Sequence, residues 1–186
     1  MNPRDERDEW LMAQVALGQR DSLEPLVRRY AGPLVGFIRR LVRDSHRSEE
    51  LFQEVFLAVW KKRQQYQFPR PFKPWLYTIA LNKCRADFRA PVRPVVGLES
   101  ESAALAVSAD ASPADLAIAG ETAEEIARVV DALPPQQRLV VALRVWEGLS
   151  YAEIAEMTGR TEATVRSHMH HGLAALRKAM APHLVH

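Results

Sequence analysis

Three histidines near the C-terminus are the residues whose type and spacing first suggest chemistry. His168, His170 and His171 lie within four positions of one another. His168 and His171 are three residues apart, so one face of a helix would present both imidazoles to a metal ion. A zinc site requires three or four ligands, and nothing nearby completes this pair. Contact with nucleic acid is the stronger interpretation for His170 and His171, and a solvated surface is the third.

The histidines fall in a segment whose pattern is typical of a helix-turn-helix. The run "SYAE", Ser150 to Glu153, is a capping box that opens a short helix. Gly159 supplies the turn, and Thr161 is expected to cap the second helix. In this motif the second helix lies in the major groove, where its N-terminal residues contact base edges. An ordinary helical hairpin is the alternative that the same pattern allows.

Projection of the second helix at about 100° per residue separates a buried face from an exposed one. The apolar stripe consists of Val165, Met169, Leu173, Leu176 and Met180. The other face carries small, polar or basic side chains, namely Ala163, Arg166, Ser167, His170 and His171. Arg166 can reach guanine or a phosphate, and Ser167 can donate to either. We therefore expect this face to read duplex DNA.

The N-terminal half offers a second surface suited to DNA. A helix is predicted from the apolar stripe formed by Leu76, Ala80, Cys84 and Phe88. The opposite face of this helix carries donors and cations, which suit phosphates and bases: Thr78, Asn82, Arg85 and Arg89.

The loop before that helix, "QYQFPRPFKP", interleaves aromatic and basic side chains. The aromatic residues in and just after it are Tyr66, Phe68, Phe72 and Trp75, and the cations around them are Lys61, Lys62, Arg63, Arg70 and Lys73. Aromatic faces and cations together hold unstacked bases, at ~1–3 kcal/mol for each stacked base. The alternative, above all for Phe72 and Trp75, is that these rings belong to the core.

Apolar residues recur at helical spacing throughout, and no strand alternation is present. The remaining stripes are Leu26, Tyr30, Leu34, Phe37 and Leu41, then Leu51, Val55 and Val59, and finally Leu139, Leu143 and Trp146. Ser48 is expected to cap the second of these helices, and a further helix is expected around residues 113–132. The sequence therefore predicts an all-α fold.

The chain of 186 residues has a net charge of only +2, but its charges are unevenly distributed. Residues 1–90 hold 17 Lys/Arg and 11 Asp/Glu, residues 91–130 hold 2 and 7, and residues 131–186 hold 6 and 5. From residue 91 to about 112, small residues, serine and acids replace large apolar side chains, which is typical of a flexible linker. We expect two small helical domains, 1–90 and 123–186, joined by a flexible acidic linker, 91–122.

Composition disfavours several other classes of protein. The single cysteine, Cys84, cannot form an intrachain disulfide, and its place on an apolar stripe predicts a buried, inert thiol. No apolar run approaches the ~18 residues of a membrane span, and the N-terminus lacks an apolar secretion segment. We expect a cytoplasmic protein. The residue order and motifs typical of hydrolases or phosphate-binding enzymes are not apparent, so we expect no enzyme and no cofactor.

In the helix-turn-helix segment and in the helices and loop of its N-terminal half, the chain resembles bacterial sigma factors of the sigma-70 family. "SEELFQEVFLAVWKK" and "FKPWLYTIALNKCRADFR" are similar to the promoter-melting region of that family. "LPPQQRLVVALRVWEGLSYAEIAEMTGRTEATVRSHMHHGLAALRK" is similar to its C-terminal region, which reads the −35 element. The short length, with these two regions and a brief linker, resembles the extracytoplasmic-function (ECF) group. The likeness covers about two thirds of the chain.

The resemblance implies a factor that binds core RNA polymerase, recognises the −35 and −10 promoter elements and melts the −10 DNA. The residues expected at the −35 duplex are Arg144, Ala163, Thr164, Arg166, Ser167, His170 and His171. Those expected at the −10 element are Tyr66, Phe68, Phe72, Trp75, Thr78, Asn82, Arg85 and Arg89, with the loop Gln64–Lys73 capturing a flipped base. The helix Ser48–Lys62 would dock on the β′ clamp coiled coil through Glu50, Gln53, Glu54 and Phe56.

The resemblance implies further partners. The C-terminal domain would contact the β flap of the polymerase, and the linker would thread toward the active centre or the RNA exit path. An anti-sigma factor that clamps both domains is expected, whereas direct membrane insertion is not. Leu81, His168 and His171 depart from the family pattern, since arginine is common there, and Asp87 lies one place later than the usual acid. These departures bear on which promoter is read.

Two other classes of function are open at this point. A stand-alone helix-turn-helix regulator would bind duplex DNA without polymerase, but it would leave the Tyr66–Trp75 loop without a role. A metal-dependent enzyme or sensor would be built on the histidines.

Overall fold

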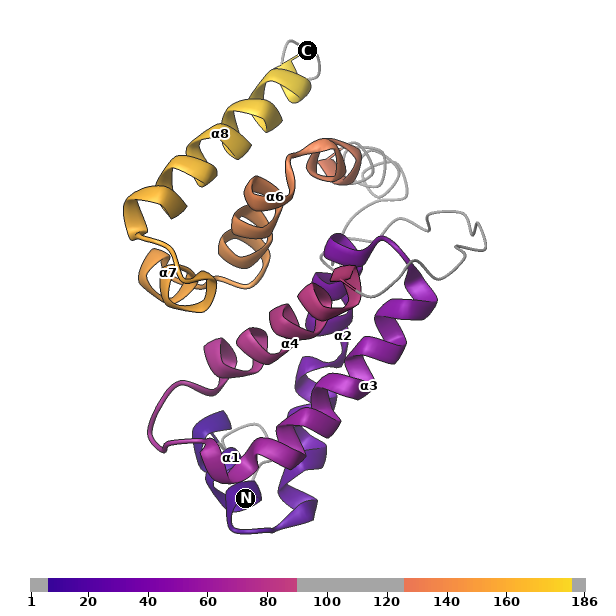
Figure 1. Cartoon of the computed structure of the whole chain (residues 1–186), viewed down its shortest axis with the longest axis vertical. Helices are drawn as coiled ribbons and strands as arrows, with labels where there is room; N and C mark the ends of the chain where they lie inside the picture. The colour runs from indigo at the N-terminus through magenta and orange to yellow at the C-terminus, as the bar shows by residue number, and fades with distance from the viewer. Residues whose placement is uncertain (1–6, 90–125, 182–186) are drawn as a thin grey trace, which may run out of the picture. The chain divides into compact units, whose positions relative to one another are not determined.

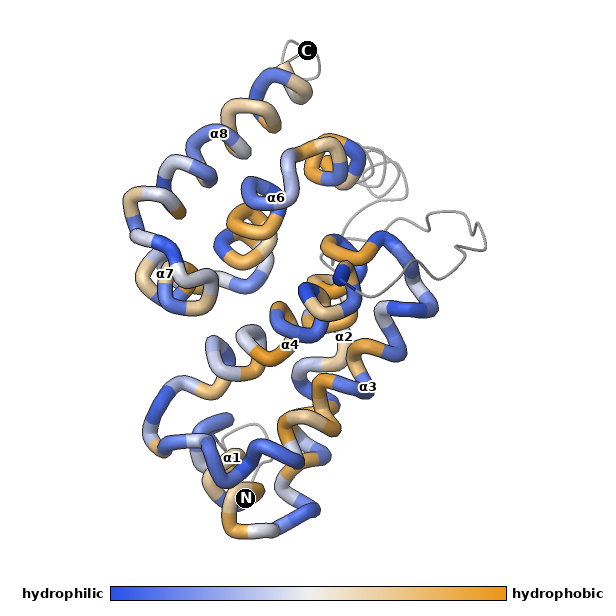
Figure 2. Tube along the Cα trace, in the orientation of Figure 1, coloured by the Kyte–Doolittle hydropathy of each residue, from blue (hydrophilic) through white to orange (hydrophobic). Residues whose placement is uncertain are grey.

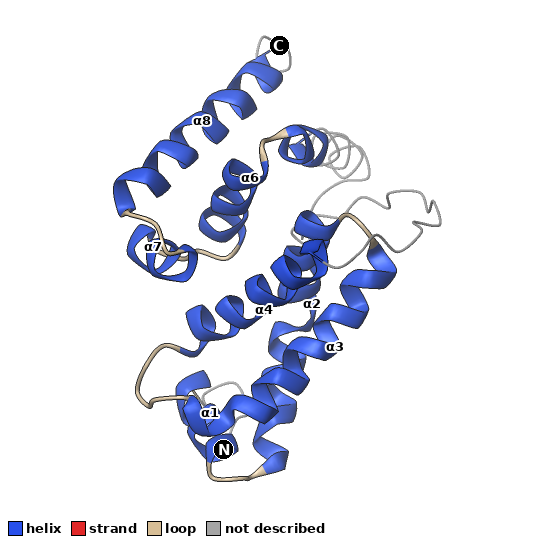
Figure 3. Cartoon of the chain, viewed as in Figure 1, coloured by secondary structure: helices blue, strands red, loops and turns tan. Residues whose placement is uncertain are grey.

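The computed structural model describes residues 7–89 and 126–181. These residues form helices and connecting loops with no strand among them (Figure 3), which confirms the predicted all-α fold. The chain divides into two units, Met1–Leu98 and Glu99–His186. The predicted linker, residues 91–122, lies outside the described residues, as does the first part of the helix expected around residues 113–132.

The N-terminal unit is built on three helices that pack against one another (Figure 1). These are α2 (Leu23–Val42), α3 (Ser45–Lys62) and α4 (Phe72–Arg89). A shorter helix, α1 (Asp8–Ala16), packs on α2 and α4, and the 3-10 turns η1 (Arg20–Ser22) and η2 (Arg63–Gln65) complete the unit.

The predicted apolar stripes form the core of this unit. All five stripe residues of α2 are buried, and so are Leu51, Val55 and Val59 of α3. Phe37 of α2 meets Tyr77 of α4 edge to face, with ring centroids 5.1 Å apart. Figure 2 shows the result as apolar segments that alternate with hydrophilic ones along these helices. Burial of one face of each helix is therefore what holds the unit together.

Two details of the sequence prediction were wrong. The N-cap of α3 is Asp44, whose carboxylate accepts from the backbone N of Arg47 at 2.8 Å. Ser48 lies inside the helix instead, where its hydroxyl donates to the carbonyl of Asp44 at 2.6 Å. Phe88 was expected on the buried stripe of α4, yet it is 61% exposed because it lies in the last turn of that helix.

The C-terminal unit begins with a helical segment at residues 126–132. The next helix, α6 (Pro135–Val141), runs into a π-helical turn, η3 (Ala142–Trp146). Two further helices, α7 (Tyr151–Thr158) and α8 (Glu162–Met180), form the predicted helix-turn-helix. Arg138 of α6 is buried, and its Nη1 donates to the carbonyl of Asp131 at 3.0 Å, at the end of the preceding helix.

The predicted caps of the helix-turn-helix are confirmed. Ser150 and Glu153 form the capping box, with the backbone N of Ser150 donating to Oε2 of Glu153 at 2.7 Å. Gly159 ends α7 with a φ of 66°, a left-handed conformation that glycine adopts without strain. The hydroxyl of Thr161 accepts from the backbone N of Thr164 at 3.2 Å. The starts of both helices are therefore fixed by local hydrogen bonds.

A glycine sets how closely α8 approaches α6. Val165 and Met169 on the predicted stripe are buried, Leu173 and Leu176 are half-buried, and Gly172 lies beside them in the interface. A Cβ at Gly172 would stand 2.7 Å from Cγ2 of Val141, which is itself fully buried. The missing side chain thus permits the packing of α8 on α6, and that packing decides which face of α8 is exposed.

We predict that Gly172→Ala destabilises the C-terminal unit by ~1–3 kcal/mol, because the new methyl group overpacks the interface. Denaturant unfolding followed by circular dichroism measures this change. Gly32→Ala is the matched control, since Gly32 also lies within a helix but has nothing within 4 Å of an added Cβ. The control should be stabilising by ~0.5–1 kcal/mol, the usual helix preference for alanine. A Gly172→Ala protein as stable as this control would contradict the packing described.

Candidate nucleic-acid interface

The first turns of α8 expose the residues that the sequence assigned to duplex DNA. Ala163, Arg166, Ser167, His170 and His171 are all exposed. Thr164 is half-buried, and its hydroxyl lies 2.9 Å from that of Thr161 in the helix cap. The structure therefore gathers the predicted set on one accessible face, with Thr164 engaged in starting the helix.

Two arginines of this unit lie against the same tyrosine. Cζ of Arg166 is 4.5 Å from the ring centroid of Tyr151, and Cζ of Arg144 is 4.9 Å from it. Arg166 also pairs with Glu162 at 3.2 Å, and Nη1 of Arg144 donates to the carbonyl of Leu149 at 2.9 Å. The shared contact with Tyr151 therefore places Arg144, in the π-helical turn, close to Arg166 on α8. Sequence reasoning did not select Tyr151.

The histidines do not form a metal cluster. Within residues 7–89 and 126–181, no group of three or more histidine, cysteine or acidic side chains is placed to hold a metal ion. Nδ1 of His171 lies 2.8 Å from the carbonyl of Ser167, and the rings of His170 and His171 meet edge to face at 5.8 Å. His168 is half-buried, with its Nε2 shielded from solvent, so it packs at the edge of the apolar stripe.

The loop between η2 and α4 differs from the prediction in how its aromatic rings are used. Phe72 is 0% exposed and Tyr66 is 7% exposed, so both belong to the core and neither presents a face to a base. Trp75 is half-buried, and its ring centroid lies 5.4 Å from that of Tyr66 and 6.1 Å from that of Phe72. Phe68 is 59% exposed and is the loop aromatic that remains accessible.

Residues of α1 help to anchor this loop from within. The carboxylate of Glu9 accepts from the backbone N of Phe72 at 3.2 Å, at the start of α4. The hydroxyl of Tyr66 donates to the carbonyl of Arg70, which closes the loop on itself. Burial, together with the nearby carboxylates of Glu9 and Asp8, raises the pKa of Tyr66 to about 12. Tyr66 therefore stays a neutral hydrogen-bond donor at physiological pH.

Asp8 ties α1 to α2. Its carboxylate accepts from the hydroxyl of Tyr30 at 2.6 Å and pairs with the guanidinium of Arg29. Burial raises the pKa of Tyr30, and the bond to Asp8 raises it further. The Tyr30 ring also meets Phe72 edge to face at 5.5 Å. The same contacts thus join α1, α2 and the base of the loop.

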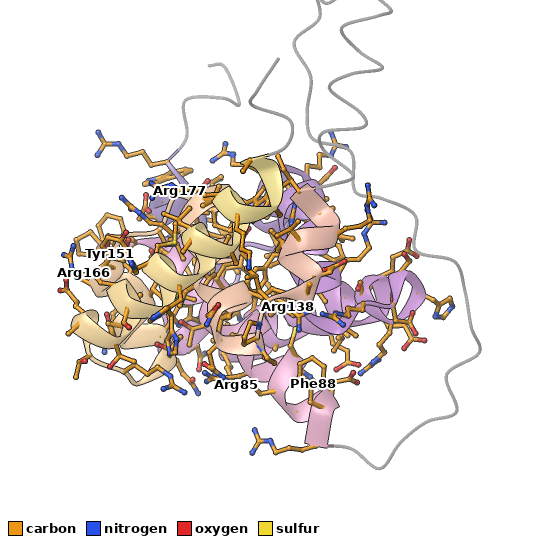
Figure 4. The ribbon with its side chains drawn as sticks, turned by 90° about the horizontal axis from the view of Figure 1, so that it is seen from above. Arg85, Phe88, Arg138, Tyr151, Arg166 and Arg177 are labelled. Carbon is orange, nitrogen blue, oxygen red and sulfur yellow. The ribbon has the colours of Figure 1, made fainter. Side chains whose placement is uncertain are left out.

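The predicted polar face of α4 is partly engaged within the helix. Asn82 and Arg89 are exposed, and Arg85 is half-buried, close to the exposed Phe88 at the end of the helix (Figure 4). The hydroxyl of Thr78 donates to the carbonyl of Pro74 at 2.8 Å, and Nε of Arg89 donates to that of Arg85 at 3.1 Å. Asn82, Arg85 and Arg89 keep donors available for a ligand.

An ionic network spans α3 and α4. Nε of Arg47 donates to Asp87 at 2.7 Å, and its Nη1 pairs with Glu50 at 2.7 Å and with Glu54 at 3.0 Å. Lys83 also pairs with Glu54 at 3.0 Å. Burial opposes the charge on both Arg47 and Glu54. The hydrogen bonds of Arg47 to Glu50, Asp87 and Glu54 outweigh this effect for the arginine, and those that Lys83 and Arg47 donate outweigh it for Glu54. The pKa of Arg47 is therefore raised and the pKa of Glu54 is lowered.

The residues assigned to polymerase docking on α3 thus differ in exposure. Phe56 is 7% exposed and meets Phe52 edge to face at 5.2 Å, so its ring packs in the core and leaves little surface for the docking role predicted for it. Gln53 is exposed, whereas Glu50 and Glu54 are committed to the ionic network. Leu57, one turn beyond Gln53, is 60% exposed, and sequence reasoning missed it. The signal was an apolar residue off the Leu51–Val55–Val59 stripe.

Cys84 is buried, as predicted. Burial, reinforced by the carboxylate of Asp87, raises the pKa of its thiol to about 12, so the reactive thiolate is suppressed. No helix of the described residues is long and apolar enough to cross a membrane.

Comparisons with known proteins agree with this arrangement. The family model for Sigma-70 region 2 matches residues 26–92, and the model for Sigma-70, region 4 matches residues 123–176. The ECF RNA polymerase sigma factor SigK of Mycobacterium ulcerans is 30% identical over 91% of this chain and 91% of its own length. The chain belongs to the ECF group of the sigma-70 family. As a sigma factor it binds core RNA polymerase, recognises the −35 and −10 elements and melts the −10 DNA; it is not an enzyme.

Solved structures share the fold of this sigma factor. CnrH, in complex with the cytosolic domain of CnrY, superposes with a TM-score of 0.68 at 24% identity, over 95% of this chain and 99% of that one. The sigma factor RpoE from Bartonella quintana, in complex with the anti-sigma factor NepR, gives a TM-score of 0.67 at 18% identity, over 86% and 96%. The alternative of a stand-alone helix-turn-helix regulator is not favoured, because sigma-family models match segments of both units.

Proposed function

We propose that this sigma factor divides promoter recognition between its two units, and that Phe68 is the residue of the N-terminal unit that holds an unstacked −10 base. The N-terminal domain, 1–90, would open the −10 DNA and bind polymerase. The C-terminal domain, 123–186, would read the −35 duplex, and residues 91–122 would connect them.

The exposure of Phe68 on an anchored loop carries the proposal for the −10 element. Its ring is 59% exposed, while Tyr66 and Phe72 on either side are buried and hold the loop in place. A ring presented in this way offers a face for stacking without first having to be ordered. Arg70 lies two residues from Phe68 and would contribute positive charge near the DNA strand that carries the unstacked base.

The half-buried Trp75 and the donors of α4 extend this surface. Trp75 rests on Tyr66 and Phe72, so its position is fixed by the core even though part of its ring remains accessible. Asn82, Arg85 and Arg89 follow along the same helix and suit the phosphates of the displaced strand. Thr78 contributes to the shape of the helix, since its hydroxyl is bonded to Pro74.

The exposed face of α8 supports the proposal for the −35 element. Arg166 and Ser167 lie in the second turn, where a recognition helix contacts base edges, and Ala163 permits close approach to the groove. His170 and His171 continue this face toward the phosphates, and Arg144 is brought beside it from the π-helical turn.

For polymerase docking we propose a surface on α3 centred on Gln53 and Leu57, which we call the α3 docking surface. Glu50 and Glu54 flank it and are held in place by Arg47. An exposed leucine beside fixed charges is a suitable centre for a protein interface, because apolar burial supplies the affinity and charges set the orientation. The β′ clamp coiled coil would cover this surface, and the β flap would contact the C-terminal domain.

We also propose an anti-sigma factor as a regulatory partner. This chain shares the fold of CnrH and of the Bartonella quintana RpoE. CnrH was solved in complex with the cytosolic domain of CnrY, and RpoE was solved in complex with the anti-sigma factor NepR. We propose a cytoplasmic location for this chain, because a sigma factor must meet core polymerase there.

We predict that Phe68→Ala reduces strand opening at the −10 element by about tenfold, which corresponds to one lost stacking contact of ~1–3 kcal/mol. Permanganate reactivity of unpaired thymines measures opening, in holoenzyme at a promoter mapped from transcript starts after overexpression. Binding of the full chain to a −35 duplex should be unchanged.

Phe88→Ala is the matched control for this experiment. Phe88 is 61% exposed in the same unit but lies at the far end of α4 from the loop. If Phe68→Ala opened DNA as well as the wild-type protein, or if both variants lost opening equally, the assignment of Phe68 would be wrong.

We predict further that Leu57→Glu weakens binding to core polymerase by about tenfold or more, since a buried leucine contributes ~1.5–3 kcal/mol. Fluorescence titration of labelled sigma factor with core enzyme measures the affinity. Leu17→Glu is the control, because Leu17 is 78% exposed just beyond α1 and lies outside the α3 docking surface. Unchanged affinity in Leu57→Glu would remove this residue from the interface.

A further inference from the structure

The ring of Tyr151 connects two arginines that come from different parts of the C-terminal unit. Tyr151 is the first residue of α7, Arg144 belongs to the π-helical turn, and Arg166 lies on α8. Cζ of Arg166 lies 4.5 Å from the centroid of the Tyr151 ring, and Cζ of Arg144 lies 4.9 Å from it. Figure 4 shows Arg166 beside Tyr151 at the edge of this unit.

Each arginine has one further contact that limits its motion without using all its donors. Nη1 of Arg144 donates to the carbonyl of Leu149 at 2.9 Å, and Nη2 of Arg166 pairs with Glu162 at 3.2 Å. A guanidinium has five N–H donors in its plane, and contact over an aromatic face leaves that edge available. Both arginines can therefore keep the ring contact while donating to a base or a phosphate.

The π-helical turn places Arg144 within reach of this ring. The backbone N of Glu147 donates to the carbonyl of Ala142 at 3.3 Å, five residues back, and that of Leu149 donates to Leu143 at 3.1 Å, six residues back. Such wide turns are uncommon inside helices and are frequent at functional sites. The backbone that follows the turn also supplies the Leu149 carbonyl that Arg144 contacts.

The aromatic ring also reduces the cost of bringing two cations together. Two guanidinium groups near one another repel, and each long side chain loses rotamer freedom when it is held for binding. The negative face of an aromatic ring attracts a cation, and Tyr151 is half-buried, so its ring is itself held by the protein. The ring thus orders both side chains before DNA arrives.

We propose that Tyr151 is a positioning residue for −35 recognition, whose ring holds Arg144 and Arg166 in the orientation in which both donate to one duplex. The inference rests on the proposed role of these two arginines at the −35 element. It assigns the function to the aromatic ring, in contrast to a direct contact between the tyrosine hydroxyl and DNA.

The test compares Tyr151→Phe, which keeps the ring, with Tyr151→Leu, which removes it. Fluorescence anisotropy of the full-length protein measures affinity for a −35 duplex and for the same duplex with the −35 bases substituted, at one fixed salt concentration. We expect Tyr151→Phe to bind within about twofold of wild type and Tyr151→Leu to bind about tenfold more weakly. The ratio of specific to substituted affinity should fall in Tyr151→Leu alone, and equal circular dichroism melts of all variants establish that they fold.

A second comparison shows whether Tyr151 acts through the arginines. In the Arg144→Ala/Arg166→Ala background, Tyr151→Leu should weaken binding by less than about twofold, because the ring has nothing left to position. A full additional loss in that background would overturn the inference, and so would Tyr151→Phe binding as weakly as Tyr151→Leu. Unchanged affinity in Tyr151→Leu would overturn it too.

The same series separates this inference from the proposed function. If Arg144→Ala/Arg166→Ala binds the −35 duplex as tightly as wild type, the assignment of the two arginines to the −35 element fails. If that variant loses affinity while Tyr151→Leu does not, only the positioning role fails.

Discussion

The N-terminal unit depends most on the packing of the buried Phe72 ring. Its ring is fully enclosed, meeting Tyr30 at 5.5 Å, Tyr66 at 6.3 Å and Trp75 at 6.1 Å, and its backbone N donates to Glu9. These contacts fix where α4 starts and where the preceding loop ends. The loop therefore cannot turn all its aromatic rings outward, and Phe68 is left exposed because the others are needed inside.

In the C-terminal unit, the packing depends in the same way on one residue, here a glycine. Gly172 admits Val141 to the surface of α8, and the buried Val165 and Met169 on that face fix the rotation of the helix. Once that rotation is set, Arg166 and Ser167 can only face outward. In both units, packing in the core determines which candidate DNA-binding side chains remain exposed. This arrangement suits a protein that must hold DNA in two different states, melted strand and duplex.

Much of this architecture could be predicted because it follows from local sequence. Helical periodicity and capping are short-range signals, so the α2 stripe, the Ser150 capping box and the exposed side of α8 were all predicted correctly. What failed depended on tertiary contacts. A phenylalanine in the sequence looks the same whether it stacks on a base or fills a core. Phe56 was therefore expected on a surface although it is buried, and the choice between surface and core stayed open for Phe72 until the structure showed it buried. Asp44 and Ser48, four residues apart, are both of a type that caps helices well, and only the backbone shows that Asp44 begins α3.

We propose a promoter-recognition factor in which one unit opens DNA and the other reads duplex. Transcription in vitro with purified core RNA polymerase tests it most directly, on a template that carries a mapped promoter and on templates with either element substituted. We expect initiation at one discrete start when the protein is added, with strong loss when the −35 or the −10 element is replaced. Initiation no better than that of core polymerase alone would contradict it.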